Sequence, residues 1–172
     1  MKFIPKFFIF FLLLFSPQLF AQTDAAEYDT FMTNYFIYTI KLDTTLQIVT
    51  AINPVNYDHP TTTDITFKGY YKKGELVRII RRIESATNID STDYFFTAGK
   101  LIYLEEKIDT IISHNPTVIN ISKRKGPCHC YFENEKWQIL GCSGAEIIQM
   151  SQIPQLLQEA KEYAEMLNSK KH

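Results

Sequence analysis

One pattern of aromatic, turn-forming and apolar residues occurs three times along the chain. Each copy has an aromatic residue, four turn-like residues and a large apolar residue, with a second aromatic residue just before it. A two-residue turn at its centre would place the flanking apolar residues opposite each other, and Gly or Asn there tolerates the positive φ that such turns require. The pattern therefore predicts an antiparallel meander of three related hairpins. The copies are Tyr71–Leu76, Phe96–Leu101 and Phe132–Trp137, preceded by Tyr70, Phe95 and Tyr131.

The segments on either side of these turns predict a sheet of about six strands. Leu76, Ile79 and Ile83 also follow a helical spacing. We favour strands because β-branched residues are abundant and the turn residues recur at the same offset. The segment Leu46–Ile52 fits a helix or a strand equally well. Residues 123–125, Lys-Arg-Lys, indicate an exposed basic turn before the last hairpin.

A helix is expected at each end of the meander. Asp24 and Glu27 have the spacing of a capping box, so the first helix is predicted from about Ala25 to about Lys41. Its apolar stripe comprises Tyr28, Phe31, Met32 and Tyr35. Pro154 fits the first turn of the second helix, whose stripe comprises Ile153, Leu156, Leu157, Ala160, Ala164 and Leu167. Because such stripes need an apolar partner, the expected fold class is α+β, with both helices packed on an antiparallel sheet.

Alternation along the strands assigns side chains to two faces of the sheet. With two-residue turns, the more apolar face is expected to meet the helices. It carries Phe67, Tyr71, Leu76, Ile80, Tyr94, Phe96, Leu101, Tyr103, Phe132, Trp137 and Ile139. The other face provides the candidate binding residues Tyr70, Phe95, Tyr131, Arg81 and His129, and it combines aromatic and apolar residues with charges. Its remaining members are Val77, Ile79, Ile102, Leu104, Leu140, Lys68, Asp93 and Glu106. Exposed aromatic residues among charges are typical of a recognition surface. Such residues are more often ordinary cross-strand pairs that stabilise a sheet, and we favour this interpretation, with the recognition surface as the alternative.

The N-terminus has the features of a signal peptide. Lys2 and Lys6 precede the apolar run Phe7–Phe15, and Ala21 is a small residue suited to cleavage. We expect residues 1–21 to be removed and residues 22–172 to form a single domain that is secreted or periplasmic; a retained membrane anchor is the alternative. The chain holds 18 basic and 19 acidic residues. Loss of Lys2 and Lys6 would leave a net charge of −3, which argues against nucleic-acid binding.

The three cysteines Cys128, Cys130 and Cys142 all lie within the third hairpin. In an oxidising compartment they predict one disulfide and one remaining thiol. A Cys128–Cys142 bond requires a one-residue bulge, for which Asn134 or Gly141 is a natural host, and a Cys130–Cys142 bond requires a larger distortion. Both pairings stay open. No metal is expected. In a strand, His129 points to the face opposite to Cys128 and Cys130, and the cysteines lack the sequence spacing that is typical of zinc sites.

No catalytic signature is present in the sequence. The four histidines are scattered, and we find no nucleophile elbow, phosphate-binding glycine loop or helical zinc motif. Arg78, Arg81 and Arg82 are expected to pair with carboxylates such as Glu105 and Glu106. We therefore expect no cofactor and no enzymatic activity. A hydrolase would need a histidine and a nucleophile to converge in one cleft.

The hairpins, written as aromatic–aromatic–x–x–Gly–Lys/Glu–Leu, resemble the MORN-type repeats found in many bacterial proteins. The resemblance covers Thr66–Gly141, with copies 25 and then 36 residues apart, and the third copy lacks the turn glycine. It implies hairpins, and it implies neither an activity nor any functional residue.

These features favour an exported, non-catalytic protein that recognises a protein or peptide partner. The partner would bind the charged aromatic face or an exposed edge strand. The alternative is a carrier of a small molecule or lipid, which would need an apolar cavity between the sheet and the helices. Neither function predicts a nucleic-acid partner, or stable membrane insertion once the signal peptide is cleaved.

Overall fold

The computed structural model describes residues 29–53, 62–85, 87–115, 118–134, 136–143 and 148–171. The predicted signal peptide and the capping box at Asp24 lie outside these residues. The chain forms two compact units, Met1–Lys41 and Leu42–His172. Residues 29–42 are helical, as predicted for this part of the chain, and the predicted start of the helix at about Ala25 lies outside the described residues. Phe31, Met32 and Tyr35, which were expected to be buried, are exposed.

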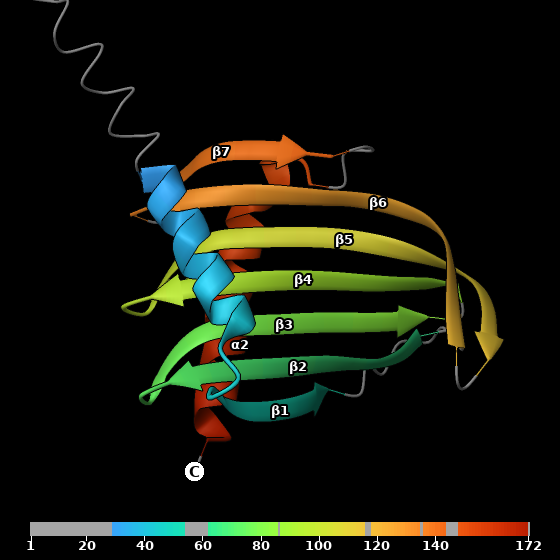
Figure 1. Ribbon diagram of the computed structural model, residues 1–172, viewed down its shortest axis with the longest axis horizontal. Coiled ribbons are helices and arrows are strands. Elements are labelled where there is room, and N and C mark those ends of the chain that lie inside the picture. The colour runs from blue at the N-terminus through green and yellow to red at the C-terminus, as the bar shows by residue number, and fades with distance from the viewer. Residues whose placement is uncertain are drawn as a thin grey trace, which may run out of the picture. The chain divides into compact units, whose positions relative to one another are not determined.

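The second unit contains a seven-stranded sheet in which every strand is antiparallel to the next and the spatial order follows the chain (Figure 1). The α+β class is therefore confirmed, with one strand more than expected because Leu46–Ile52 largely becomes β1. The basic segment 123–125 lies inside β6 and forms no turn. The strands are β1 (Gln47–Asn53), β2 (Thr62–Lys72), β3 (Glu75–Ser85), β4 (Asn88–Thr97), β5 (Lys100–Asn115), β6 (Val118–Glu133) and β7 (Lys136–Cys142).

The three predicted turns are present. Lys73 and Gly74 have φ angles of 50° and 88°, and Ala98 and Gly99 have 48° and 74°. Asn134 has a φ of 49° in the third turn. Positive φ at both central residues is characteristic of the two-residue turns whose twist matches that of paired strands. The repeated sequence pattern therefore corresponds to a repeated backbone conformation in the first two turns and, in the third, at Asn134.

Each hairpin also contains a bulge that the sequence analysis did not include. Tyr71 pairs with Leu76, but Tyr70 pairs with Arg78, so Val77 is an extra residue in β3. The pairings of β4 with β5 and of β6 with β7 leave Ile102 and Gln138 extra in the same way. All three extra residues stand at the same offset from their turns.

The bulges overturn part of the predicted assignment of faces. One inserted residue moves every later side chain of its strand to the opposite face. Ile79 and Leu104 therefore join Phe67 and Tyr94 in the core, whereas they were assigned to the other face. Arg81 and Glu106 change face with them, and Ile80 and Tyr103 move the other way. We call the core side the helix face and the opposite side the far face.

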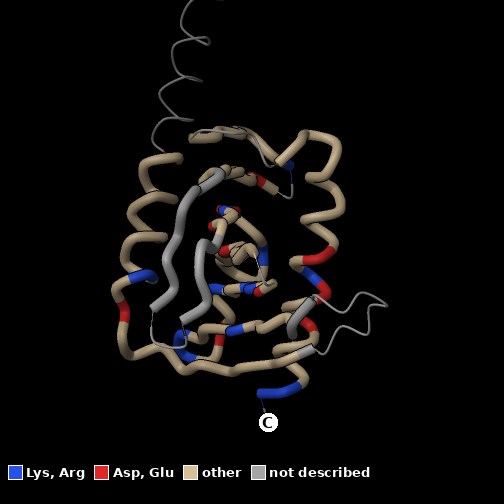
Figure 2. Tube along the Cα trace, turned by 90° about the vertical axis from the view of Figure 1, so that its right-hand side faces the viewer, with Lys and Arg blue, Asp and Glu red and all other residues tan. Residues whose placement is uncertain are grey.

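Helix α2 (Ile153–Ser169) follows a short 3₁₀ turn, η1 (Met150–Gln152), and packs on the helix face. The side view shows α2 along one side of the sheet, with the C-terminus at the β1 end (Figure 2). Gly69 permits this approach, because a Cβ atom there would lie 3.1 Å from Cδ1 of Leu167. The predicted stripe is confirmed, and its buried members are Ile153, Leu156, Ala160 and Leu167.

A disulfide joins Cys128 and Cys142, which face each other across β6 and β7. The bulge that this pairing requires is present, but Gln138 hosts it rather than Asn134 or Gly141. Cys130 is free and buried, and burial raises the pKa of its thiol to about 11. Among the helices described, none has the length and apolar composition needed to cross a membrane.

Candidate functional site

A row of side chains crosses the helix face, one from each neighbouring strand. Phe67 of β2 pairs with Arg81 of β3, and Arg81 pairs with Thr92 of β4. Thr92 in turn pairs with Glu106 of β5, and Glu106 with Cys128 of β6. The register therefore places a guanidinium and a carboxylate on either side of a fully buried threonine, on the side of the sheet that α2 covers.

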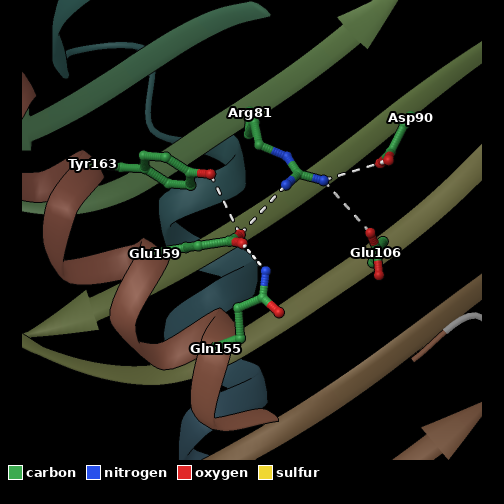
Figure 3. A network of polar contacts seen from close by, with 6 residues as sticks. All are labelled: Arg81, Asp90, Glu106, Gln155, Glu159 and Tyr163. Atoms are coloured by element: carbon green, nitrogen blue, oxygen red, sulfur yellow. Dashed lines mark hydrogen bonds and ion pairs between the residues drawn. The ribbon is translucent and has the colours of Figure 1, made fainter. Parts of the chain in front are cut away.

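Arg81 lies among three carboxylates from three elements (Figure 3). Its Nη2 atom is 3.4 Å from Oδ2 of Asp90 and 3.6 Å from Oε1 of Glu106. Its Nη1 atom is 3.5 Å from Oε2 of Glu159 on α2. With all four groups ionised, one positive charge faces three negative charges, and the cluster has a formal charge of −2.

Glu159 is fixed in this position by its neighbours on α2. The side-chain amide of Gln155 donates a 2.8 Å hydrogen bond to Oε1 of Glu159. The hydroxyl of Tyr163 donates to Oε2 at 3.3 Å. These residues are four apart, so one turn of helix brings each of them beside Glu159. Both carboxylate oxygens therefore have defined partners, and Glu159 points toward Arg81.

Burial makes the cluster sensitive to pH. Loss of hydration raises the pKa of Glu106 to about 7, with a further increase from the negative charge of Asp90 and an opposing decrease from Arg81. Burial also raises the pKa of Asp90, although Arg81 lowers it. Desolvation disfavours the charged form of a carboxyl group. Glu106 is therefore about half protonated near neutral pH.

Several buried polar atoms of the site have no hydrogen-bond partner within the part of the chain that the structure describes. They include Oγ1 of Thr92 and the hydroxyl of Tyr94, two fully buried residues of β4 on the helix face. Nε of Arg81 and Oδ1 of Asp90 are two further examples. Buried polar groups are normally hydrogen-bonded, so such a concentration marks a place where water or a ligand is expected.

An open pocket of about 200 Å³ reaches this cluster between α2 and the sheet. The pocket has room for about six water molecules. Its walls combine charged groups from the sheet with amides from the start of α2. The lining residues are Arg81, Glu106, Gln152, Gln155, Leu156 and Glu159. Among the described residues, no group of three or more His, Cys, Asp or Glu side chains is arranged to hold a metal ion.

The predicted binding residues are divided between the two faces. Tyr70, Phe95, His129 and Tyr131 lie on the far face, and the bulge at Val77 places Arg81 on the helix face. Phe95 is fully buried. The other three far-face residues are half-buried.

The far-face aromatic residues contact one another and an arginine. The guanidinium carbon of Arg78 lies 5.2 Å from the ring centre of Tyr70 and 5.3 Å from that of Phe95. Arg78 also donates to both carboxylate oxygens of Asp93, at 3.0 and 2.8 Å. This arrangement fits cross-strand pairing within the sheet, the interpretation that the sequence favours for these aromatic residues.

His129 has a similar environment. It stacks on Tyr103 with ring centres 6.3 Å apart and meets Tyr131 edge-on at 5.7 Å. Gly141, its partner in β7, leaves the space for the imidazole, since a Cβ atom there would lie 2.7 Å from Nε2 of His129. His129 is on the face opposite to Glu106, so these two groups do not form one site.

Sequence reasoning found Arg81 and its pairing with Glu106, but it missed Asp90, Thr92 and Glu159. The spacing of α2 places Glu159 outside the apolar stripe. Only the packing of α2 on β3 shows that its carboxylate meets Arg81. Comparison with family models, curated proteins and solved structures gives no match to this chain. The resemblance to MORN-type repeats stays a prediction, although the three hairpins on which it rests are present.

Proposed function

We propose that the protein is an exported, non-catalytic binding protein that recognises a protein or peptide partner by accepting a basic side chain in the Arg81 pocket. The observation that carries this proposal is the excess of three carboxylates over one guanidinium around an open pocket. An ammonium or guanidinium group would reduce the net charge of the cluster and supply hydrogen-bond donors.

Electrostatic attraction supports a cationic ligand over a neutral one. Two unit charges 4 Å apart interact with about 4 kcal/mol at an effective dielectric constant of about 20. A cation beside Glu106 and Glu159 would be attracted by both carboxylates and repelled by Arg81. Above about pH 7, where Glu106 is mostly ionised, two attractions exceed one repulsion at similar distances, so the net interaction is attractive.

The size of the pocket supports one side chain of a larger partner. Pockets that hold a whole small molecule typically measure about 300–1,000 Å³, and this one measures about 200 Å³. A second open pocket of about 280 Å³ lies between the turns at Gly74 and Gly99 and the last part of α2. Neither of these two pockets has the volume that a lipid carrier needs.

Export rests on the predicted signal peptide together with the Cys128–Cys142 disulfide, because such bonds persist mainly in oxidising compartments. The partner would accordingly be another exported protein or a segment exposed at the cell surface.

The proposal is tested with capped tripeptides, Ac-Ala-Lys-Ala-NH₂ and Ac-Ala-Arg-Ala-NH₂, titrated into the ¹⁵N-labelled protein. The neutral control is the norleucine peptide. We expect the basic peptides to shift the amide signals of Gln152, Gln155 and Glu106, and to bind more tightly at low salt. Recovery of the peptides unchanged agrees with a non-catalytic role, and their cleavage would contradict it.

A matched pair of variants locates the binding. Glu159→Gln removes one charge from the pocket and should weaken binding about tenfold, equivalent to about 1.4 kcal/mol. Glu162→Gln is the control, because Glu162 is exposed on the same helix and accepts the same kind of bond from Gln158. Equal effects of the two variants, or equal binding of the lysine and norleucine peptides, would refute the proposal.

A further inference from the structure

We propose that β1 is a dimerisation edge, which pairs antiparallel with β1 of a second copy and joins the two sheets into one. β1 is the first strand of the sheet and pairs on one side with β2 (Figure 1). Among the strands that the structure describes, none pairs with its other side. An edge of this kind presents unpaired backbone N–H and C=O groups to another strand.

The two edge strands of the sheet differ in how they are protected. Natural edge strands commonly carry a lysine, a proline or a bulge that discourages pairing. β7 begins with Lys136 and contains the bulge at Gln138. β1 has the sequence QIVTAIN, without charge or proline, and its register with β2 is continuous. Only β1 therefore has the regular, neutral backbone that strand addition requires.

The side chains of β1 are exposed on the far face in a regular alternation. Ile48 and Ile52 each keep 56% of their surface exposed, and Thr50 between them is also exposed. Their neighbours Val49 and Ala51 belong to the core or pack against it. The exposed isoleucines lose part of their contact with water when the side chains of another strand pack beside them. This loss of exposed apolar surface favours association.

The sequence of β1 is chemically symmetric about Thr50, and this symmetry identifies a second copy as the occupant. An antiparallel pair with its two-fold axis at Thr50 places each residue opposite the one equally far on the other side of the centre. Ile48 would face Ile52 of the second copy, Val49 would face Ala51, and Gln47 would face Asn53. Each pair matches apolar with apolar or amide with amide. A single strand pair is a small interface, so the association is expected to depend on concentration.

The geometry is tested by disulfide trapping in a Cys130→Ala background. Thr50→Cys would place the two Cα atoms one strand spacing apart, about 4.8 Å, across the proposed axis, which is within the range for a disulfide. Lys68→Cys is the matched control, because Lys68 is the partner of Thr50 in β2 and is also exposed. Two copies of residue 68 would be three spacings apart, about 14 Å, beyond the reach of a disulfide. We expect Thr50→Cys to give a covalent dimer under mild oxidation and Lys68→Cys to give none.

The pairing of residues 48 and 52 is tested by charge exchange, with the mass in solution measured by sedimentation velocity. Ile48→Lys combined with Ile52→Lys places lysine opposite lysine and should weaken the dimer at least tenfold. Ile48→Lys combined with Ile52→Glu places opposite charges together and should retain it. Circular dichroism confirms that each variant is folded. A monomeric mass at all concentrations up to about 1 mM overturns the proposal, as does equal trapping of Thr50→Cys and Lys68→Cys or equal association of the two charge variants.

Discussion

Replacement of Glu106 by glutamine is expected to stabilise the protein above neutral pH. Burial and the charge of Asp90 raise the pKa of Glu106 from 4.5 to about 7, although Arg81 lowers it. The folded protein therefore holds a proton on this carboxyl between pH 4.5 and 7, where the unfolded chain has released it. A folded state that binds more protons loses stability as the pH rises. The ionised carboxylate thus lowers the free energy of unfolding above pH 7, and glutamine removes this effect.

The magnitude follows from the difference between the folded and unfolded pKa values. A pKa rise from 4.5 to about 7 corresponds to a ceiling of about 3 kcal/mol. The side chain of Glu106 keeps 13% of its surface exposed, and water at the open pocket screens its charge. Glutamine also loses the attraction to Arg81 across 3.6 Å. We therefore expect Glu106→Gln to be more stable than the native protein by about 1–2 kcal/mol at pH 8, with little difference at pH 5.

Urea unfolding at pH 5, 6, 7 and 8, followed by circular dichroism, measures the difference between the two proteins. The gain should grow from pH 5 to pH 7 and then level off. Glu162→Gln, which removes a charge from the exposed side of α2, controls for the change in net charge and should show no such dependence. A Glu106→Gln variant that is equally destabilised at pH 5 and pH 8 would show that the carboxylate stabilises the fold, contrary to the pKa argument.

Two further predictions concern the third hairpin, and urea unfolding measures both. Gly141→Ala should cost about 1–2 kcal/mol, because its methyl group would lie 2.7 Å from Nε2 of His129. In a His129→Ala background, Gly141→Ala should cost almost nothing, because the clashing imidazole is gone. Equal costs of Gly141→Ala in the native and His129→Ala backgrounds would contradict this. Reduction of the Cys128–Cys142 disulfide, whose cysteines are 14 residues apart, should cost about 3 kcal/mol. Cys130→Ala is the control, and dithiothreitol should lower its stability as much as that of the native chain. A urea midpoint of the native chain that does not change on reduction would contradict the prediction.

The sequence was sufficient to predict the features that depend on nearby residues. The turns at Lys73 and Ala98 follow from a glycine in the next position, which adopts positive φ without strain. The helix at Ile153 follows from a proline in its first turn and an apolar stripe of helical period. These signals act within a few residues, so they can be recognised in a single sequence.

The positions of the functional side chains depend on contacts that the sequence does not reveal. The bulge residues Val77 and Ile102 are ordinary strand residues, and nothing in their type distinguishes a paired from an extra position. One uncounted residue was enough to assign Arg81 to the wrong face. The approach of Glu159 to Arg81 joins residues 78 positions apart and depends on how α2 lies across the sheet.

The recurrence of the bulge explains why a charged cluster lies beside the core. Each bulge follows its turn, so the side chains after the extra residue change face in both β3 and β5. β4, which lies between these two strands, has no such change of face before its own turn. The two shifts act in the same direction, and they bring Arg81 and Glu106 to the helix face together, on either side of Thr92. A single bulge would have placed one of these charges opposite α2 and left its partner on the far face. The repeated hairpin therefore shapes the sheet and also assembles the charged row with which the carboxylate of Glu159 completes the pocket.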